Sequence, residues 1–170
     1  NAILHRMDPA LPPELAVMFN PLGAGFRWAV EVPQTQVGDT VLILGPGQRG
    51  LASVVAARHA GAGKIIVTGR SADARKLEIA RRLGADHTID VDNEPALERI
   101  KSYTGGRGAD VVVEVTSYAT EPVRDALGYV RPGGTIVLAG VKGFKPVDDF
   151  VSDLIVLNEI TIRGVIGVTS

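Results

Sequence analysis

Residues 41–50 read Val-Leu-Ile-Leu-Gly-Pro-Gly-Gln-Arg-Gly, and this stretch decides the fold. A short apolar run leads directly into the pattern Gly45-x-Gly47-x-x-Gly50, and a helix-compatible segment follows at 51–60. In a strand–turn–helix of this kind, the first glycine makes the tight turn and the second lets the backbone approach a pyrophosphate. The third lets helix and strand pack closely. The start of the helix then offers free N–H groups and the positive end of its dipole to the phosphates. Glycine-rich turns are common, but the strand before this one and the helix after it favour a dinucleotide site over a purely structural turn.

Strand-like and helix-like segments alternate along the rest of the chain. Strands are expected at 41–44, 64–68, 87–89, 110–114, 135–139 and 160–164. Helices are expected at 48–60, 73–83, 94–103, 121–130 and 150–157. This alternation predicts an α/β fold with a parallel sheet covered on both faces, and right-handed crossovers favour the doubly wound, six-stranded Rossmann order 3-2-1-4-5-6. We assign residues 37–170 to this dinucleotide-binding domain and residues 1–36 to a lead-in segment belonging to a domain junction.

The composition fits one globular domain and argues against several classes of function. With 170 residues, 45% hydrophobic and 22% charged, the chain is long enough to bury a core. A net charge of -1 gives no reason to expect nucleic acid or an anionic membrane as a partner. No apolar stretch approaches the roughly 20 residues that a membrane helix needs. The absence of cysteine excludes disulfides, thiolate metal ligands and cysteine nucleophiles within the chain.

The two ends of the sequence carry two expectations. Residues 1–10 contain no long apolar segment of a secretory signal, so we expect a cytoplasmic location. The chain starts with Asn1 and ends just after a strand-like run at 160–168, so we interpret it as a piece of a longer protein.

The end of the second expected strand predicts which cofactor binds. An NAD site usually has Asp or Glu here to accept hydrogen bonds from the ribose, but residues 68–71 read Thr-Gly-Arg-Ser. Gly69 leaves room where the acid would lie, Arg70 can pair with a 2′-phosphate, and Ser71 can donate a further hydrogen bond. We therefore predict NADP(H) in preference to NAD(H), the alternative being a solvated arginine in an ordinary turn. The missing acid also argues against a methyltransferase, which typically uses one to hold the ribose of its cofactor.

Several further segments extend over nearly the whole chain and resemble one family. They are Val37-Gly-Asp-Thr-Val41, Ala80-Arg-Arg-Leu-Gly-Ala-Asp86, Gly108-Ala-Asp-Val-Val-Val-Glu-Val115, Arg131-Pro-Gly-Gly-Thr-Ile-Val-Leu-Ala-Gly140 and Ile160-Thr-Ile-Arg-Gly164. Together they resemble the cofactor domain of medium-chain dehydrogenases, the zinc-type alcohol dehydrogenase superfamily, nearest its polyol and threonine dehydrogenase branch. The resemblance implies hydride transfer between a nicotinamide and a small alcohol or carbonyl substrate, which a further domain would bind. It also implies a homodimer formed through the sheet edge near 160–168.

The resemblance further implies a set of cofactor-binding residues. The glycine turn would hold the pyrophosphate, the end of the second strand the adenosine ribose, and the turns after the fourth, fifth and sixth strands the remainder. By position these residues are Gly45, Gly47, Gln48, Arg49 and Gly50; Gly69, Arg70, Ser71 and Lys76; Thr116 and Ser117; Ala139, Gly140 and Val141; and Val165. For the residues after the fourth, fifth and sixth strands, packing in the core or in a turn is the competing interpretation.

The sequence argues against a complete catalytic metal site within this chain. The stretch Phe19-Asn-Pro-Leu-Gly23 resembles the branch in which Glu or Asp before Pro-Leu lies at a catalytic zinc, but Asn20 is a weaker ligand. The chain's histidines lack metal spacing, and the acidic group at 90–94 resembles a solvated turn. We predict no complete catalytic constellation within the chain, and zinc only in the longer protein. The alternatives are a zinc-independent quinone or enoyl reductase and a non-catalytic nucleotide-binding or redox-sensing module.

Overall fold

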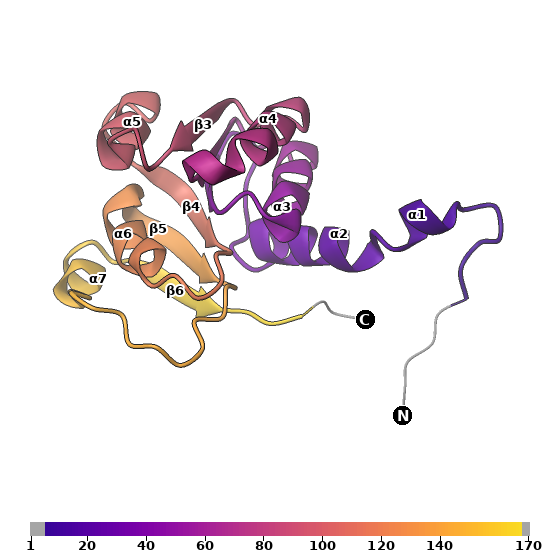
Figure 1. The fold of residues 1–170 in the computed structure, drawn as a ribbon. Helices are drawn as coiled ribbons and strands as arrows, with labels where there is room; N and C mark the ends of the chain where they lie inside the picture. Colours follow the sequence, from indigo (N-terminus) through magenta and orange to yellow (C-terminus); the bar gives the residue numbers. More distant parts are fainter. Residues whose placement is uncertain (1–5, 168–170) are drawn as a thin grey trace.

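A computed structural model describes residues 6–167, in which six strands form one sheet with helices on both faces (Figure 1). The strands are β1 (Thr40–Leu44), β2 (Lys64–Gly69), β3 (His87–Asp90), β4 (Ala109–Glu114), β5 (Val130–Leu138) and β6 (Thr161–Gly164). Every neighbouring pair is parallel, and the spatial order is β3-β2-β1-β4-β5-β6. The expected doubly wound Rossmann fold and its strand order are therefore confirmed.

The helices divide between the two faces of the sheet because the inner strands alternate their side chains. On one face, Val41 and Ile43 pack with α3 (Gln48–His59) and α4 (Ala74–Arg82). On the other face, Leu42 and Leu44 pack with α5 (Ala96–Tyr103) and α6 (Glu121–Tyr129). All four strand side chains are nearly or fully inaccessible to solvent, as a parallel sheet covered on both faces requires. No helix in the described part of the chain is both long enough and apolar enough to cross a membrane.

The lead-in segment is helical and packs on the face that carries α3. It contains α1 (Pro13–Ala16), α2 (Phe19–Phe26) and the π-helical turn η1 (Arg27–Glu31). Gly25 lets α2 approach closely, since a Cβ there would lie 2.5 Å from the carbonyl oxygen of Ala52 in α3. Trp28 is 2% exposed and belongs to the same core cluster as β1. The boundary at residue 37 stays a prediction, and residues 1–5 of the lead-in lie outside the described part.

Three expected helices differ from the observed ones at their N-terminal ends. The helix expected from 73 begins as a 3-10 turn, η2 (Ser71–Asp73), in which the Asp73 carboxylate accepts a hydrogen bond from the N–H of Arg70. The helix expected from 94 begins only at Ala96, after Pro95. The helix expected at 150–157 is reduced to α7 (Asp153–Leu157).

Strands β5 and β6 also depart from expectation. Strand β5 begins five residues early, at Val130, because Val130 already pairs with Ala109. A register shift then accommodates the Pro-Gly-Gly bend before Thr135 pairs with Val111. The run expected at 160–168 contains a strand only at Thr161–Gly164, and residue 168 lies outside the described part.

Candidate functional site

A cleft of about 590 Å³ opens at the carboxyl ends of the central strands. Its walls include the ends of β1 (Leu44, Gly45), β2 (Thr68, Gly69) and the turn after β4 (Thr116, Ser117). Strands β1 and β4 are neighbours in the sheet although β2 and β3 separate them along the chain. The chain therefore reverses its direction of travel across the sheet at this cleft. In open α/β sheets, ligands bind at such a switch point.

The glycine turn lies at the cleft, and each of its three glycines has a different geometric role. Gly45 has φ +107°, which an L side chain rarely adopts, and its N–H donates to the carbonyl oxygen of Thr68 at 3.1 Å. A Cβ on Gly50 would lie only 2.0 Å from the carbonyl oxygen of Gly45, so α3 can approach the turn only with glycine here. Gly47 has no described atom within 4 Å of its Cβ position and faces open space.

The N-terminus of α3 lies beside this open space. Gly47 is its N-cap residue, and no side chain within the described residues caps the helix. Gln48 and Arg49 occupy the first turn with exposed side chains, and the Arg49 guanidinium lies over the ring of Trp28, 5.3 Å from its centre. The first N–H groups of the helix are therefore available to an anion, although contact with the amides of Gln48 and Arg49 remains a prediction.

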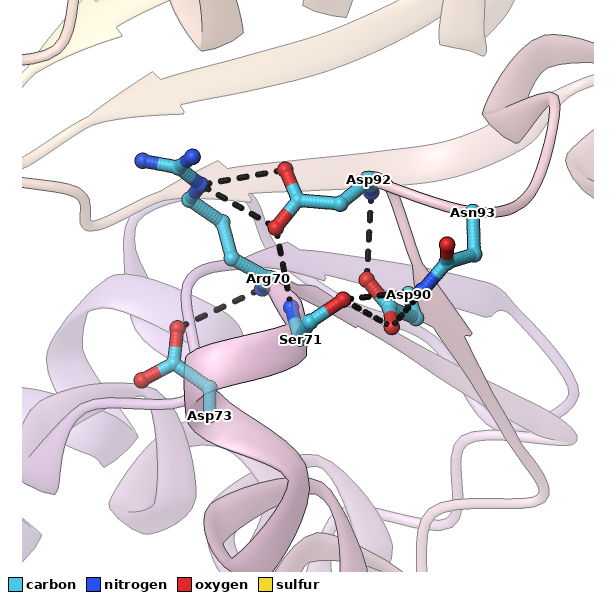
Figure 2. Close-up of polar contacts among 6 residues, drawn as sticks. All are labelled: Arg70, Ser71, Asp73, Asp90, Asp92 and Asn93. Carbon is cyan, nitrogen blue, oxygen red and sulfur yellow. Dashed lines mark hydrogen bonds and ion pairs between the residues drawn. The ribbon is translucent and has the colours of Figure 1, made fainter.

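The residues expected to bind the ribose phosphate are already engaged with carboxylates (Figure 2). Arg70 contacts Asp92 through Nε, at 3.1 and 3.4 Å from its two carboxylate oxygens. Ser71 donates its N–H to Asp92 at 3.0 Å and its hydroxyl to Asp90 at 2.6 Å. On α4, Lys76 Nζ lies 2.7 Å from Asp73 Oδ1. The loop after β3 therefore brings acids to a place where the sequence predicts only positive charge.

The hydrogen bonds of this acidic cluster keep two of its members ionised. The Ser71 hydroxyl holds the pKa of Asp90 below its usual range, and the Lys76 ammonium does the same for Asp73. The two terminal guanidinium nitrogens of Arg70 make no hydrogen bond among the described residues, and the side chain is 74% exposed. Arg70 thus remains able to bind an anion, whereas Ser71 has both of its donors occupied.

The turn after β4 lines the cleft, and the turn after β5 packs on it. A Cβ on Gly140 would lie 1.9 Å from the carbonyl oxygen of Thr116, so the β5 turn packs directly on the β4 turn. Val141 accepts a hydrogen bond from the N–H of Tyr118 at 3.0 Å, and Val165 donates its own N–H to Leu138. Of the predicted residues, only five line the cleft: Gly45, Gly69, Arg70, Thr116 and Ser117. The other predicted residues do not line it, and Ala139 and Val165 pack against the hydrophobic core.

Helix α6 supplies a wall of the cleft that the sequence analysis missed. Glu121, Asp125 and Tyr129 line it, and burial raises the pKa of Tyr129 to about 12. These three residues are spaced by four, which places them on one face of a helix. That spacing, in the helix following the strand at the switch point, is the signal that could have identified them.

The described residues do not fit a zinc ion. No group of three histidine, aspartate or glutamate side chains suited to a metal lies in residues 6–167, and the chain has no cysteine. Asn20 lies in α2 and offers only a neutral amide oxygen, which is a poor zinc ligand.

Comparison with other sequences finds relatives over nearly the whole chain. A family model described as zinc-binding dehydrogenase matches residues 50–170. A probable alcohol dehydrogenase of Mycobacterium tuberculosis is 42% identical over 170 residues, which cover 99% of this chain and 46% of the relative. Sorbitol dehydrogenase of Bacillus subtilis is 36% identical over 155 residues, which cover 89% and 42%. The chain spans about half the length of these curated relatives.

Solved structures agree with this comparison. An alcohol dehydrogenase from Thermus sp. ATN1 superposes with a TM-score of 0.85 at 28% identity, over 96% of this chain and 46% of that one. A putative zinc-binding dehydrogenase from Sinorhizobium meliloti 1021, bound to NADP, superposes with a TM-score of 0.86 at 29% identity, over 94% and 46%.

Proposed function

The chain belongs to the zinc-binding dehydrogenase family, within the medium-chain, zinc-type alcohol dehydrogenase superfamily, and from this premise we propose that it is the cofactor-binding half of an oxidoreductase. The proposed reaction is hydride transfer between NADP(H) and a small alcohol or carbonyl compound. Its relatives are alcohol and polyol dehydrogenases. Because the chain spans about half of their length, the substrate pocket and the proton-transfer groups are proposed to lie in the other half.

The uncapped N-terminus of α3 at the switch-point cleft is the observation that carries this proposal. The N–H groups of the first helical turn would bind the pyrophosphate, helped by the positive end of the helix dipole. Gly47 would allow the phosphates to approach the backbone, because nothing occupies the position of its missing Cβ. Thr116 and Ser117 would lie along the cofactor, and Ala139 to Val141 near its nicotinamide end. The nicotinamide itself supplies the hydride acceptor or donor carbon.

Three observations support NADP(H) as the cofactor. Strand β2 ends at Gly69, and the room expected there from the sequence is absent: a Cβ would lie 2.8 Å from Pro46, so an acid would fit only if its neighbours moved. The terminal nitrogens of Arg70 are exposed and match the geometry of a phosphate. The relative from Sinorhizobium meliloti was solved with NADP bound. The carboxylates of Asp73 and Asp92 oppose the phosphate, so we expect a moderate preference rather than exclusion of NAD(H).

Calorimetric titration with NADPH and NADH at one fixed salt concentration tests both parts of the proposal. We expect NADPH to bind about tenfold more tightly (about 1.4 kcal/mol). Arg70→Ala should close this gap, while the matched control Arg82→Ala should leave it unchanged, because Arg82 pairs with Glu78 on the exposed side of α4. Equal binding of the two cofactors would overturn the NADP preference, and binding of neither would overturn the cofactor role of this chain.

A zinc-independent reductase is a second candidate, favoured by Asn20, whose neutral amide oxygen is a poor zinc ligand. This candidate keeps the cofactor and the hydride chemistry, and differs only in how the substrate oxygen is polarised. Metal analysis of the full-length protein separates the two. One zinc per chain, if it is lost when metal ligands in the other half of the protein are substituted, would favour the alcohol dehydrogenase. An active protein without zinc would favour the reductase.

We further propose that the chain forms a homodimer through β6. Within the described residues, β6 pairs only with β5, which leaves its other edge open. An open edge can pair with the same strand of a second copy. Sedimentation of the chain should give a dimer, and Ile162→Pro, which cannot continue a strand ladder, should shift it towards monomer.

A further inference from the structure

A buried charge pair joins the turns after β4 and β5, and nothing proposed above uses it. Glu114, the last residue of β4, is completely buried. Lys142 comes from the segment after β5, its side chain is 11% exposed, and its Nζ lies 2.8 Å from Glu114 Oε1. Lys142 also donates to the carbonyl and hydroxyl oxygens of Thr116. These three bonds satisfy all three donors of the ammonium group.

The same carboxylate holds the Thr116 turn directly. Glu114 Oε1 accepts hydrogen bonds from the Thr116 hydroxyl and from its backbone N–H, the latter at 2.9 Å. The backbone carbonyl of Glu114 accepts the N–H groups of Ala139 and Gly140. One buried residue therefore fixes the start of both turns. A pair this deeply buried contributes little net stability compared with apolar side chains of the same volume, so its value lies in the geometry that it imposes.

The charge pair is connected to the cleft through Thr116. Thr116 lines the cleft, and its Cγ2 atom lies 2.9 Å from the Cβ position of Gly45, in the glycine turn. On the other side of Lys142, residues 143–152 have no helix or strand of their own, and the side chain of Phe144 is fully exposed. Among the described residues, the other hydrogen bonds between this part of the chain and the β4 turn are one from the N–H of Tyr118 to Val141, which precedes Lys142, and a long, exposed one of 3.4 Å from Lys145 to Tyr118.

We propose that Lys142 is a positioning residue for the nicotinamide half of the cofactor. With Glu114 it fixes the Thr116–Ser117 turn and the segment after β5 in the arrangement that receives this half. This inference rests on the proposed function. The adenosine half lies at the end of β2, remote in the sheet from this pair, because β1 separates β2 from β4. Loss of Lys142 should therefore weaken binding of the whole dinucleotide and leave binding of the adenosine half unchanged.

Two ligands and a set of matched variants test whether Lys142 acts on the nicotinamide half of the cofactor alone. NADPH and adenosine 2′,5′-bisphosphate, which lacks the nicotinamide half, are titrated calorimetrically into each protein. The informative variant is the double substitution Glu114→Gln and Lys142→Met, since Lys142→Met alone leaves a buried unpaired carboxylate and is more prone to unfold. Lys145→Met is the control, because this exposed lysine lies in the same segment and makes only one long hydrogen bond, 3.4 Å, to the carbonyl oxygen of Tyr118.

We expect the double variant to bind NADPH at least tenfold more weakly and the bisphosphate within twofold of the unaltered chain. Lys145→Met should change neither, and Arg70→Ala should weaken both. A merely structural role for the pair predicts an equal loss for both ligands, and that outcome, or no loss at all, overturns the proposal.

Amide hydrogen exchange on the ligand-free chain provides a second readout that does not depend on cofactor binding. In the segments 116–118 and 139–140, the hydrogen-bonded amides of Thr116, Tyr118, Ala139 and Gly140 should exchange at least tenfold faster in the double variant, while β1 and β2 keep their protection. Unchanged exchange in those two segments would overturn the proposal. If the unaltered chain binds neither ligand, the proposed function fails and the cofactor role of Lys142 fails with it, and the exchange result then decides only whether the Glu114–Lys142 pair fixes the two turns.

Discussion

Two alanine substitutions in the glycine turn should separate stability from cofactor binding. At Gly50, a Cβ would lie 2.0 Å from the carbonyl oxygen of Gly45, where ordinary contact begins near 3.4 Å. The oxygen belongs to the backbone of the turn, and the Cβ is fixed to the backbone of α3. The helix and the turn must therefore separate by about 1.4 Å to relieve the overlap. At Gly47, the Cβ would meet nothing within 4 Å, and φ is -67°, which any residue adopts. Only the first substitution should therefore strain the fold.

The expected magnitudes follow from this geometry. Forcing atoms into a packed site costs about 1–3 kcal/mol, and the better helix propensity of alanine offsets a fraction of one kcal/mol, so Gly50→Ala should lose about 2 kcal/mol. An unfolding entropy of about 2.1 cal/mol/K per residue gives about 0.36 kcal/mol/K for 170 residues, so Tm should fall by about 6 °C. Gly47→Ala should stay within about 0.5 kcal/mol of the unaltered chain, because a weaker N-cap is offset by a less flexible unfolded chain. Its NADPH affinity should fall at least tenfold (about 1.4 kcal/mol).

Urea and thermal unfolding can be followed through Trp28, the single tryptophan, which is 2% exposed in the folded chain. Calorimetric titration with NADPH provides the second measurement on the same samples. A Gly50→Ala variant that unfolds within 1 °C of the unaltered chain would refute the close-approach argument. A Gly47→Ala variant that binds NADPH normally would refute the assignment of this turn to the pyrophosphate.

Three further predictions concern titratable groups. Burial holds the pKa of His87 below 6.5, and its ring stacks on Tyr103 at 3.8 Å. The stability that the neutral ring contributes is present above pH 6.5 and is lost as the pH falls through the folded pKa. His87→Phe should therefore flatten the pH dependence of the unfolding free energy measured by urea between pH 5 and 8, and an unchanged slope would contradict this. Burial raises the pKa of Asp110, but a hydrogen bond from the Thr40 N–H and the neighbouring arginines outweigh it and hold the pKa below 3.8. Asp110→Asn should therefore lower the free energy of unfolding by about 2 kcal/mol at pH 7. Urea titrations should show this difference shrinking as the pH falls through the folded pKa of Asp110. A difference that does not depend on pH would contradict a stabilising role for the carboxylate charge. Burial raises the pKa of Tyr129 to about 12, so stability present below pH 10 should be lost between pH 10 and 12. Ultraviolet absorbance should show one phenol with a midpoint near 12 that Tyr129→Phe removes, and loss of a phenol titrating near 10 instead would show that the side chain is not buried.

The order of the sheet and the glycine turn could be predicted because their signals are local. Residues 41–44 are all apolar, and 110–114 have an apolar centre, as parallel strands buried on both faces require. The helices between the strands end at glycine, which is a local stop signal. Right-handed crossovers then allow few strand orders. The ends of elements were less predictable, as at β5, where pairing of Val130 with Ala109 extends the strand through a Pro-Gly-Gly bend that looks like a turn in the sequence.

The sequence by itself determined the Rossmann fold, the family and the position of the glycine turn, since each depends on short segments whose residues are close together along the chain. Tertiary structure alone decided which charges meet at the site. Arg70 and Asp92 are 22 residues apart, and Glu114 and Lys142 are 28 apart, and no periodicity links either pair. They meet because parallel strands place their carboxyl ends along one edge of the sheet, so loops distant in sequence converge there. Side-chain pairing across that edge depends on the rotamers and paths of two loops, which spacing along one chain does not encode.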